Sequence, residues 1–138
     1  MKTYDFSEAG VSYRMSGLTL KIKDDYCVPI RAEHLRRVKR LIEDKLIDIA
    51  DVAAMRNDAI SISFTSEVVA RDLCLPHGIE RMLRLLVSRI DADGKTLPIT
   101  EENVVTLLMK IMDEDSETNR TFRQVMEDAY PKAQAPTS

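Results

Sequence analysis

Two amphipathic patterns between His77 and Met112 constrain the fold of this chain most strongly. Apolar residues in the first pattern recur at the spacing of one helix face: Ile79, Met82, Leu83, Leu86, Val87 and Ile90. The second pattern follows Thr100 and contains Val104, Val105, Leu107, Leu108, Ile111 and Met112. Gly94 and Pro98 lie between the two patterns, where they end one helix and redirect the chain. We therefore expect a helical hairpin over residues 77–112.

The composition is that of a folded domain of ordinary size. The chain has 138 residues, of which 44% are apolar and 31% charged. We expect one domain over residues 1–130 and a mobile tail over 131–138. The net charge of −3 favours neither nucleic acid nor a membrane as a partner. No apolar run approaches the roughly 18 residues of a membrane span and no signal peptide is evident, so we expect a cytoplasmic protein with reduced cysteines.

An alternation of apolar and polar residues over 11–23 predicts an N-terminal β-hairpin. A two-residue turn at 16–17 would place six apolar side chains on one face: Val11, Tyr13, Met15, Leu18, Leu20 and Ile22. Residues 59–64 alternate in the same way and are a candidate third strand. The predicted class is α+β, mostly helical, with the hairpin packed on four to five helices.

The remaining helices follow from capping and breaking residues. Pro29 is placed to open a helix that runs to about Leu46, with a break near Asp48 and a short turn after it. Thr65, Ser66 and Glu67 form a helix start, and that helix should end before Pro76. A last helix follows the acidic connector 113–117 and ends before Pro131.

Two clusters suggest metal sites, and neither has the required spacing. Asp91, Asp93 and Gly94 suggest a calcium loop, but the first and twelfth ligand positions are Arg89 and Thr100, which favours a turn between two helices. A zinc set would need four side chains: Cys27, His34, Cys74 and His77. Only the second pair has zinc-ligand spacing. We therefore expect no metal and no cofactor.

Catalysis has no sequence motif to support it. The chain contains neither a glycine-rich phosphate loop nor a nucleophile elbow, and it has only two histidines. Its paired acids lie in a turn and in a first helical turn, where acids are common for electrostatic reasons. We expect a protein that is not an enzyme, with no catalytic residue.

Two sets of residues are candidates for binding a protein partner. Methionine adapts its shape to a partner helix, which favours the apolar residues Met82, Leu86, Met109 and Met112. The basic face of residues 31–40 offers Arg36, Arg37 and Arg40, although a solvated helix surface, balanced by nearby acids, is the favoured explanation of those charges. As an alternative, residues 65–86 have the order of a helix-turn-helix, in which Arg81 and Arg84 would contact DNA.

The segment from Gly78 to Tyr130 resembles the C-terminal part of tail assembly chaperones from long-tailed bacteriophages. The residues that carry the resemblance are Asp93 through Val104 (DGKTLPITEENV) and Phe122 through Tyr130, together with the N-terminal stretch from Gly10 to Leu20. Members of this family commonly have a tryptophan in the helix before the turn, and this chain has none.

The resemblance implies a small, mostly helical protein without enzymatic activity, acting in the host cytoplasm. It would bind the tape measure protein, or another tail protein, during tail assembly. A homo-oligomer is left open. The alternatives are a winged-helix DNA-binding regulator and a small structural subunit of a phage particle.

Overall fold

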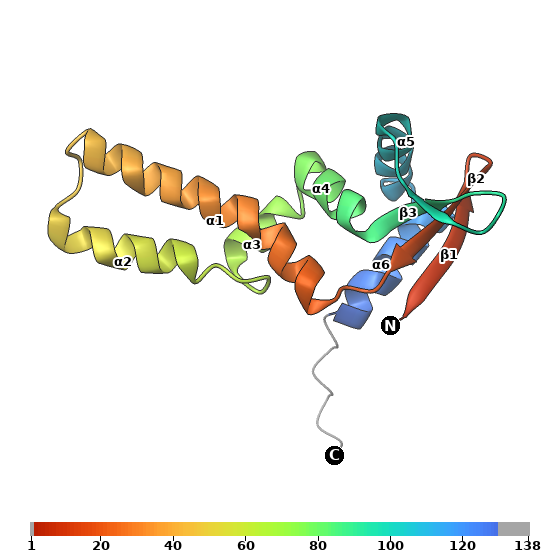
Figure 1. Ribbon diagram of the computed structural model, residues 1–138, viewed down its shortest axis with the longest axis horizontal. Coiled ribbons are helices and arrows are strands. Elements are labelled where there is room, and N and C mark those ends of the chain that lie inside the picture. The colour runs from red at the N-terminus through yellow and green to blue at the C-terminus, as the bar shows by residue number, and fades with distance from the viewer. Residues whose placement is uncertain (1, 130–138) are drawn as a thin grey trace, which may run out of the picture. The chain divides into compact units, whose positions relative to one another are not determined.

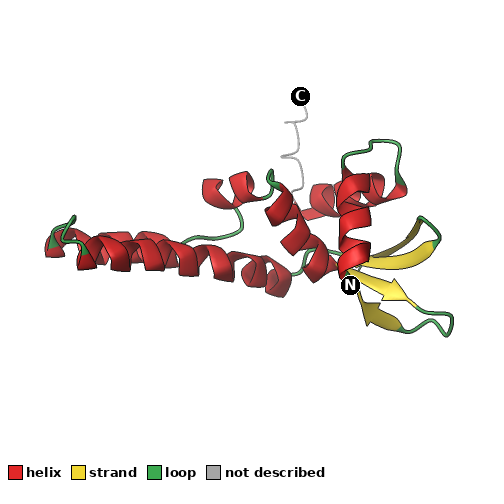
Figure 2. Cartoon of the chain, turned by 90° about the horizontal axis from the view of Figure 1, so that it is seen from above, coloured by secondary structure: helices red, strands yellow, loops and turns green. Residues whose placement is uncertain are grey.

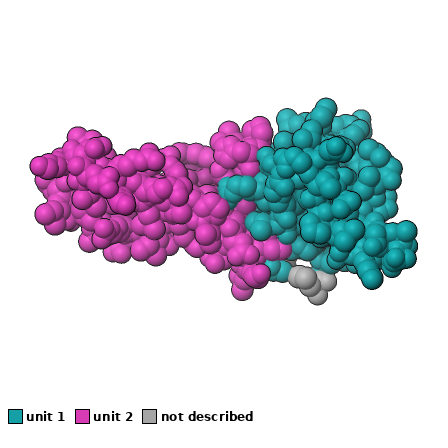
Figure 3. Space-filling model, turned by 45° about the horizontal axis from the view of Figure 1, so that its top comes forward, with its two compact units in different colours: residues 1–19, 79–138 teal, residues 20–78 magenta. Residues whose placement is uncertain are grey.

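A four-stranded antiparallel sheet and six helices make up residues 2–129, the part of the chain that the computed structural model describes. The α+β, mostly helical class is thereby confirmed. The chain divides into two units, one of residues 1–19 and 79–138 and the other of residues 20–78 (Figure 3). The single domain expected over 1–130 stays a prediction, and the expected tail over 131–138 lies outside the described residues.

The sheet of the first unit has the strand order β1-β2-β3-β4 (Figure 1; yellow in Figure 2). Its strands are β1 (Thr3–Glu8), β2 (Val11–Ser16), β3 (Val87–Ile90) and β4 (Thr96–Pro98). Ala9 and Gly10 connect β1 to β2 with φ values of 52° and 80°, the left-handed backbone that a two-residue hairpin turn requires. Phe6 on β1 stacks on Tyr13 on β2, with ring centroids 5.4 Å apart. This aromatic pair fixes which face of the hairpin is buried.

The predicted hairpin over 11–23 was wrong in its partner strand. β2 pairs with β1 on one side and with β3 on the other, so no edge of β2 remains for residues 18–22. Gly17 instead donates its backbone N–H to the Lys2 carbonyl at 2.9 Å, and a helix begins at Leu20. Leu20, in the first turn of that helix, is 85% exposed, so the apolar alternation of 18–22 does not mark a buried face.

The predicted third strand over 59–64 was also wrong. Residues 49–60 form helix α2 (Ile49–Ile60), and turns follow it up to Ser66. The alternation arises because Ile62 and Phe64 are buried within the second unit. The Phe64 ring lies edge-on to Tyr26, and Arg31 donates to the Ile62 carbonyl at 2.7 Å.

The expected helical hairpin over 77–112 proved to be helix, β-hairpin, helix. Helix α4 (Pro76–Leu86) ends four residues before the apolar pattern does, because residues 87–90 form β3. These residues pair with β2 on one side and β4 on the other. Their backbone groups therefore form more hydrogen bonds than they would in the last turn of a helix. Helix α5 (Glu101–Ile111) begins after Thr100 as predicted, and Thr100 and Asn103 form a reciprocal capping box.

The hydrophobic core of the first unit lies between the sheet and its helices. Helix α6 (Glu117–Ala129) packs on β1 and β2, and α5 packs on α6. The side chains that are completely or almost completely buried there include Tyr13, Met15, Met82, Leu83, Val104, Leu107 and Val125. The last helix was predicted at this position, and its apolar spacing identified Val125 as an inward residue.

The second unit is built on a long helical pair. Helix α1 (Leu20–Glu43) and α2 run antiparallel and pack on each other (orange and yellow in Figure 1). The prediction that this helix begins at Pro29 was wrong, since Pro29 lies inside α1, where it removes one helical hydrogen bond without ending the helix. The break expected near Asp48 is present, and helix α3 (Glu67–Asp72) starts where Ser66 predicted it.

Candidate protein-binding surface

Helix α5 has apolar residues on two sides, and only one side is covered. Val104, Leu107 and Ile111 are buried in the core of the first unit. Val105, Met109 and Met112, at i, i+4 and i+7, lie on the opposite side and are exposed, Met109 at 69% and Met112 at 79%. We call Val105, Met109 and Met112 the α5 outer face. An apolar row of this length on a helix surface is a feature of partner-binding sites.

Hydrogen bonds hold the C-terminal end of α5, where Met112 lies. Ser116 donates its hydroxyl to the Lys110 carbonyl at 2.6 Å, and the Asn119 side-chain amide donates to the Ile111 carbonyl. Both acceptors belong to the last helical turn, where carbonyl groups have no partner within the helix. Ser116 and Asn119 are themselves buried, so the loop that follows α5 is anchored in the core. The α5 outer face is therefore a fixed surface.

Acidic side chains surround the α5 outer face at both ends. Glu101 and Glu102 occupy the first turn of the helix, and three acids follow it: Asp113, Glu114 and Asp115. All five residues are exposed. Lys110, the basic residue in the last turn, lies 3.9 Å from the Glu8 carboxylate, which offsets its charge. Glu101 is paired with Arg84 and Glu114 with Arg123, so among the described residues Glu102, Asp113 and Asp115 are the acids around this surface that have no ion pair. These three give the surroundings of the α5 outer face a negative charge.

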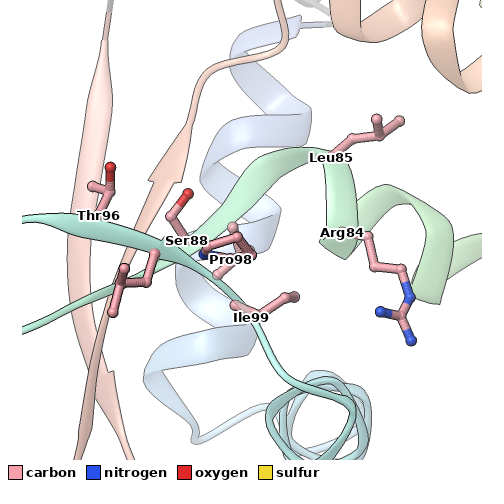
Figure 4. A pocket seen from close by; sticks show the side chains of 8 residues that line it. Arg84, Leu85, Ser88, Thr96, Pro98 and Ile99 are labelled. Atoms are coloured by element: carbon pink, nitrogen blue, oxygen red, sulfur yellow. The ribbon is translucent and has the colours of Figure 1, made fainter.

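A pocket of about 460 Å³ lies in the same unit, between α4 and the β3–β4 hairpin (Figure 4). Its lining includes Arg84, Leu85, Ser88, Pro98 and Ile99. Arg84 forms ion pairs with Glu80, at 3.0 Å, and with Glu101. The hydrogen bond from Arg84 to Glu101, and to a smaller extent the one to Glu80, raises the pKa of the guanidinium. Two neighbouring carboxylates thus compensate the charge of Arg84.

The predicted partner-binding residues fall into three places. Met82 and Leu86 are buried in the core, so they are not available to a partner. Met109 and Met112 are on the α5 outer face. Val105 also lies there and was not predicted, although its spacing of four and seven residues from these methionines indicates the same side of the helix. The basic residues Arg36, Arg37 and Arg40 lie on α1 in the second unit and are exposed. The DNA-binding candidates Arg81 and Arg84 lie on α4.

The residues of the candidate metal clusters have other roles. Asp91 accepts hydrogen bonds from the backbone N–H groups of Asp93 and Lys95, so it shapes the β3–β4 turn, which replaces the expected turn between helices. Cys27 is buried, whereas Cys74 is exposed. Within residues 2–129, no three His, Cys, Asp or Glu side chains lie close enough together to hold a metal ion. Over the same residues, no helix has the length and apolarity needed to cross a membrane.

Comparisons with known proteins give no relative. No protein-family model matches the chain, no curated protein is significantly similar to it, and no solved structure matches its fold.

Proposed function

We propose that this chain is a non-enzymatic protein that binds a helical segment of a protein partner through the α5 outer face. The observation that carries the proposal is the exposure of Val105, Met109 and Met112 on a helix whose other side is buried in the core. Exposed methionines at helical spacing suit a surface that must fit a partner helix, because the unbranched side chain changes shape easily. The anchored α5–α6 loop keeps this surface in place before binding, which lowers the entropic cost of association.

The charges around the α5 outer face indicate which helices it would accept. Acids at both ends favour a partner whose apolar stripe is flanked by lysine or arginine. Such a helix would place its apolar residues on Met109 and Met112 and its basic residues near Glu102 and Asp113. A partner helix with acidic flanks would be repelled.

The resemblance of residues 93–104 and 122–130 to tail assembly chaperones supplies a specific setting. In that setting the partner is the tape measure protein, a long helical protein that aggregates unless it is bound during tail assembly. The function we propose is therefore that of a phage tail assembly chaperone. An exposed apolar helix face with a negative surround is compatible with this role.

The test is co-expression with the tape measure protein of the same phage. The amount of soluble tape measure protein is measured with the wild-type chain, with the variant Met109→Asp and Met112→Asp, and with Leu20→Asp. The two methionines are exposed, so the aspartates should leave folding intact while placing charges where the partner helix would pack. Leu20 is 85% exposed in the first turn of α1, where an aspartate is favourable, so Leu20→Asp is the matched control.

We expect the wild-type chain and Leu20→Asp to keep the tape measure protein soluble and the double variant to fail. The proposal is wrong if the wild-type chain has no effect, or if all three chains act alike. Circular dichroism spectra of the purified variants separate loss of binding from loss of folding.

The order of elements keeps DNA binding as a second candidate function. Three residues join α3 to α4, and the β3–β4 hairpin follows directly, which is the order of a helix-turn-helix with a wing. Against it, Arg84 is paired with two carboxylates. If DNA is bound, affinity for a random duplex should fall steeply with salt, and Arg81→Ala with Arg84→Ala should weaken it. Affinity that responds to neither change rejects this candidate.

A further inference from the structure

The outer part of the α1–α2 pair is not covered by any other element of its unit. Between Lys39 and Asp58 every residue is at least partly exposed, whereas Val38 and Ala59 on either side of this stretch are buried. Seven large apolar residues fall in it: Leu41, Ile42, Leu46, Ile47, Ile49, Val52 and Met55. Two helices that only cover each other leave much of their apolar surface in water, so this part of the fold lacks a packing partner.

Two apolar features continue this surface. A groove of about 330 Å³ lies between the helices, lined by the apolar side chains of Val38, Leu41, Met55, Ala59, Ile62 and Val68. Along α1, the residues Val28, Leu35 and Ile42 are exposed at seven-residue intervals, which places them in one row about 21 Å long. A row with this spacing is typical of a helix that packs lengthwise against another helix.

Charge is separated along the same pair of helices. Residues 36–40, near the C-terminal end of α1, form a basic segment with Arg36, Arg37, Lys39 and Arg40. Lys39 lies 4.0 Å from the Glu43 carboxylate. Arg36 and Arg37 share the single carboxylate of Glu33, and within the described residues Arg40 makes no ion pair.

The end of the pair, where α1 turns into α2, is acidic on balance, with four acids, Glu43, Asp44, Asp48 and Asp51, and one base, Lys45. Three of these acids, Asp44, Asp48 and Asp51, have no ion-pair partner among residues 2–129. The surface thus has a net positive charge along residues 36–40 and a net negative charge along residues 43–51.

We propose that this surface binds a second copy of the chain, with the two α1–α2 pairs antiparallel about a two-fold axis. In that arrangement the acidic end of each copy lies over the basic segment of the other, and both contacts are attractive. A parallel arrangement would place acid on acid and base on base. A surface with an apolar row and with charges of both signs is complementary to a second copy of itself. A partner of one charge sign would be attracted to only one of its two charged segments.

Sedimentation velocity of the purified chain at several concentrations tests the proposal. We expect a species of twice 15.7 kDa whose dissociation constant rises with salt. Leu46→Asp with Ile49→Asp should raise that constant by about 100-fold or more, because each copy would bury two carboxylates in place of apolar side chains, a desolvation cost that attraction to the basic segment offsets only in part. Ile49 is 90% exposed, so these changes should leave the helix content of the monomer unaltered. Leu20→Asp is the control that should still form the dimer.

A charge exchange tests whether the partner is a second copy held by these charges. One variant carries Arg36→Glu and Arg40→Glu, and the other carries Glu43→Lys and Asp44→Lys. Each variant alone should be monomeric, and an equal mixture of the two should form a heterodimer, because both contacts are then attractive again. The lysines fall at the C-terminal end of α1, where positive charge suits the helix dipole.

A wild-type chain that stays monomeric at every concentration overturns the proposal. So does a dimer that is unaffected by Leu46→Asp with Ile49→Asp, or a mixture of charge variants that does not associate. None of these measurements involves the α5 outer face or its partner, so they are independent of the proposed function.

Discussion

The two sides of α5 should respond in opposite ways to the same substitution. Leu107 is completely buried, whereas Met109, two residues along the same helix, is 69% exposed. We predict that Leu107→Ala destabilises the chain strongly and that Met109→Ala leaves the free energy of unfolding nearly unchanged. Leu107 and Met109 both lie in the C-terminal half of α5, two residues apart, and leucine and methionine have similar helix propensities, so these differences nearly cancel between the two substitutions.

The magnitude follows from burial. Removing a fully buried leucine side chain to alanine costs about 2–5 kcal/mol, since the transfer free energy is lost and a cavity is left. A substitution at an exposed position away from any cap changes stability by about 0.5 kcal/mol or less. With a urea m-value of about 2 kcal/mol/M, a loss of about 3 kcal/mol lowers the unfolding midpoint by about 1.5 M.

Urea unfolding followed by circular dichroism at 222 nm measures this difference, since the chain has no tryptophan for fluorescence. The reasoning is refuted if Met109→Ala lowers the midpoint as far as Leu107→Ala does. That result would mean that the α5 outer face is packed within the isolated chain, and it would remove the basis for proposing a partner there.

Two further predictions concern the sheet. Ala9 has a φ of 52°, which costs a non-glycine residue roughly 1 kcal/mol. Asparagine suits this turn position, so Ala9→Asn should raise the free energy of unfolding by about 0.5–1 kcal/mol in urea. Gly10→Ala should lower it because φ is 80° at Gly10, although no atom lies within 4 Å of the added methyl group. Burial raises the pKa of Tyr13, so above about pH 10 the unfolded chain loses this proton first and stability should fall as pH rises, as measured by urea unfolding at a series of pH values. No loss of stability between neutral pH and pH 11 would contradict the placement of Tyr13.

The elements that were predicted correctly are those specified by neighbouring residues. Thr100 and Asn103 determine the start of α5 by hydrogen bonds over three positions, and Ser66 marks the start of α3. Such signals do not depend on the rest of the fold, so the sequence is sufficient to detect them.

The errors arose where pairing between distant segments decided the structure. Residues 11–16 are a strand in both the prediction and the structure, but their partners are β1 and β3, which alternation within one segment cannot reveal. Residues 87–90 satisfy a helical spacing and a strand equally well, and the ladder with β2 decides between them. Strand β1 (Thr3–Glu8) was not predicted from the sequence. Ala9 and Gly10 form the hairpin turn, but Ser16 and Gly17 have the residue types of a hairpin turn as well.

The candidate site was predictable in its residue type and not in its exposure. The sequence shows methionines on several helices, but it cannot say which side of a helix the core covers. Met82 and Met109 illustrate this, since both lie on amphipathic helices and one is buried while the other is exposed. Apolar spacing identifies a helix face, and only the position of the sheet and α6 determines that Val104 and Leu107 point inward.

The two proposals concern separate units of the chain, and together they predict how affinity depends on the length of the partner. A dimer held by the α1–α2 pairs would carry two α5 outer faces, so a long partner with repeated helical segments could occupy both. The second contact is then intramolecular, and the apparent affinity exceeds that of one face by a factor set by the effective concentration. We predict that Leu46→Asp with Ile49→Asp weakens binding to the long partner but not to a single-helix fragment of it, measured by calorimetry. Equal affinities of the variant and the wild-type chain for the long partner would show that each copy binds alone. Met109→Asp should weaken binding to both ligands, because it alters the face itself.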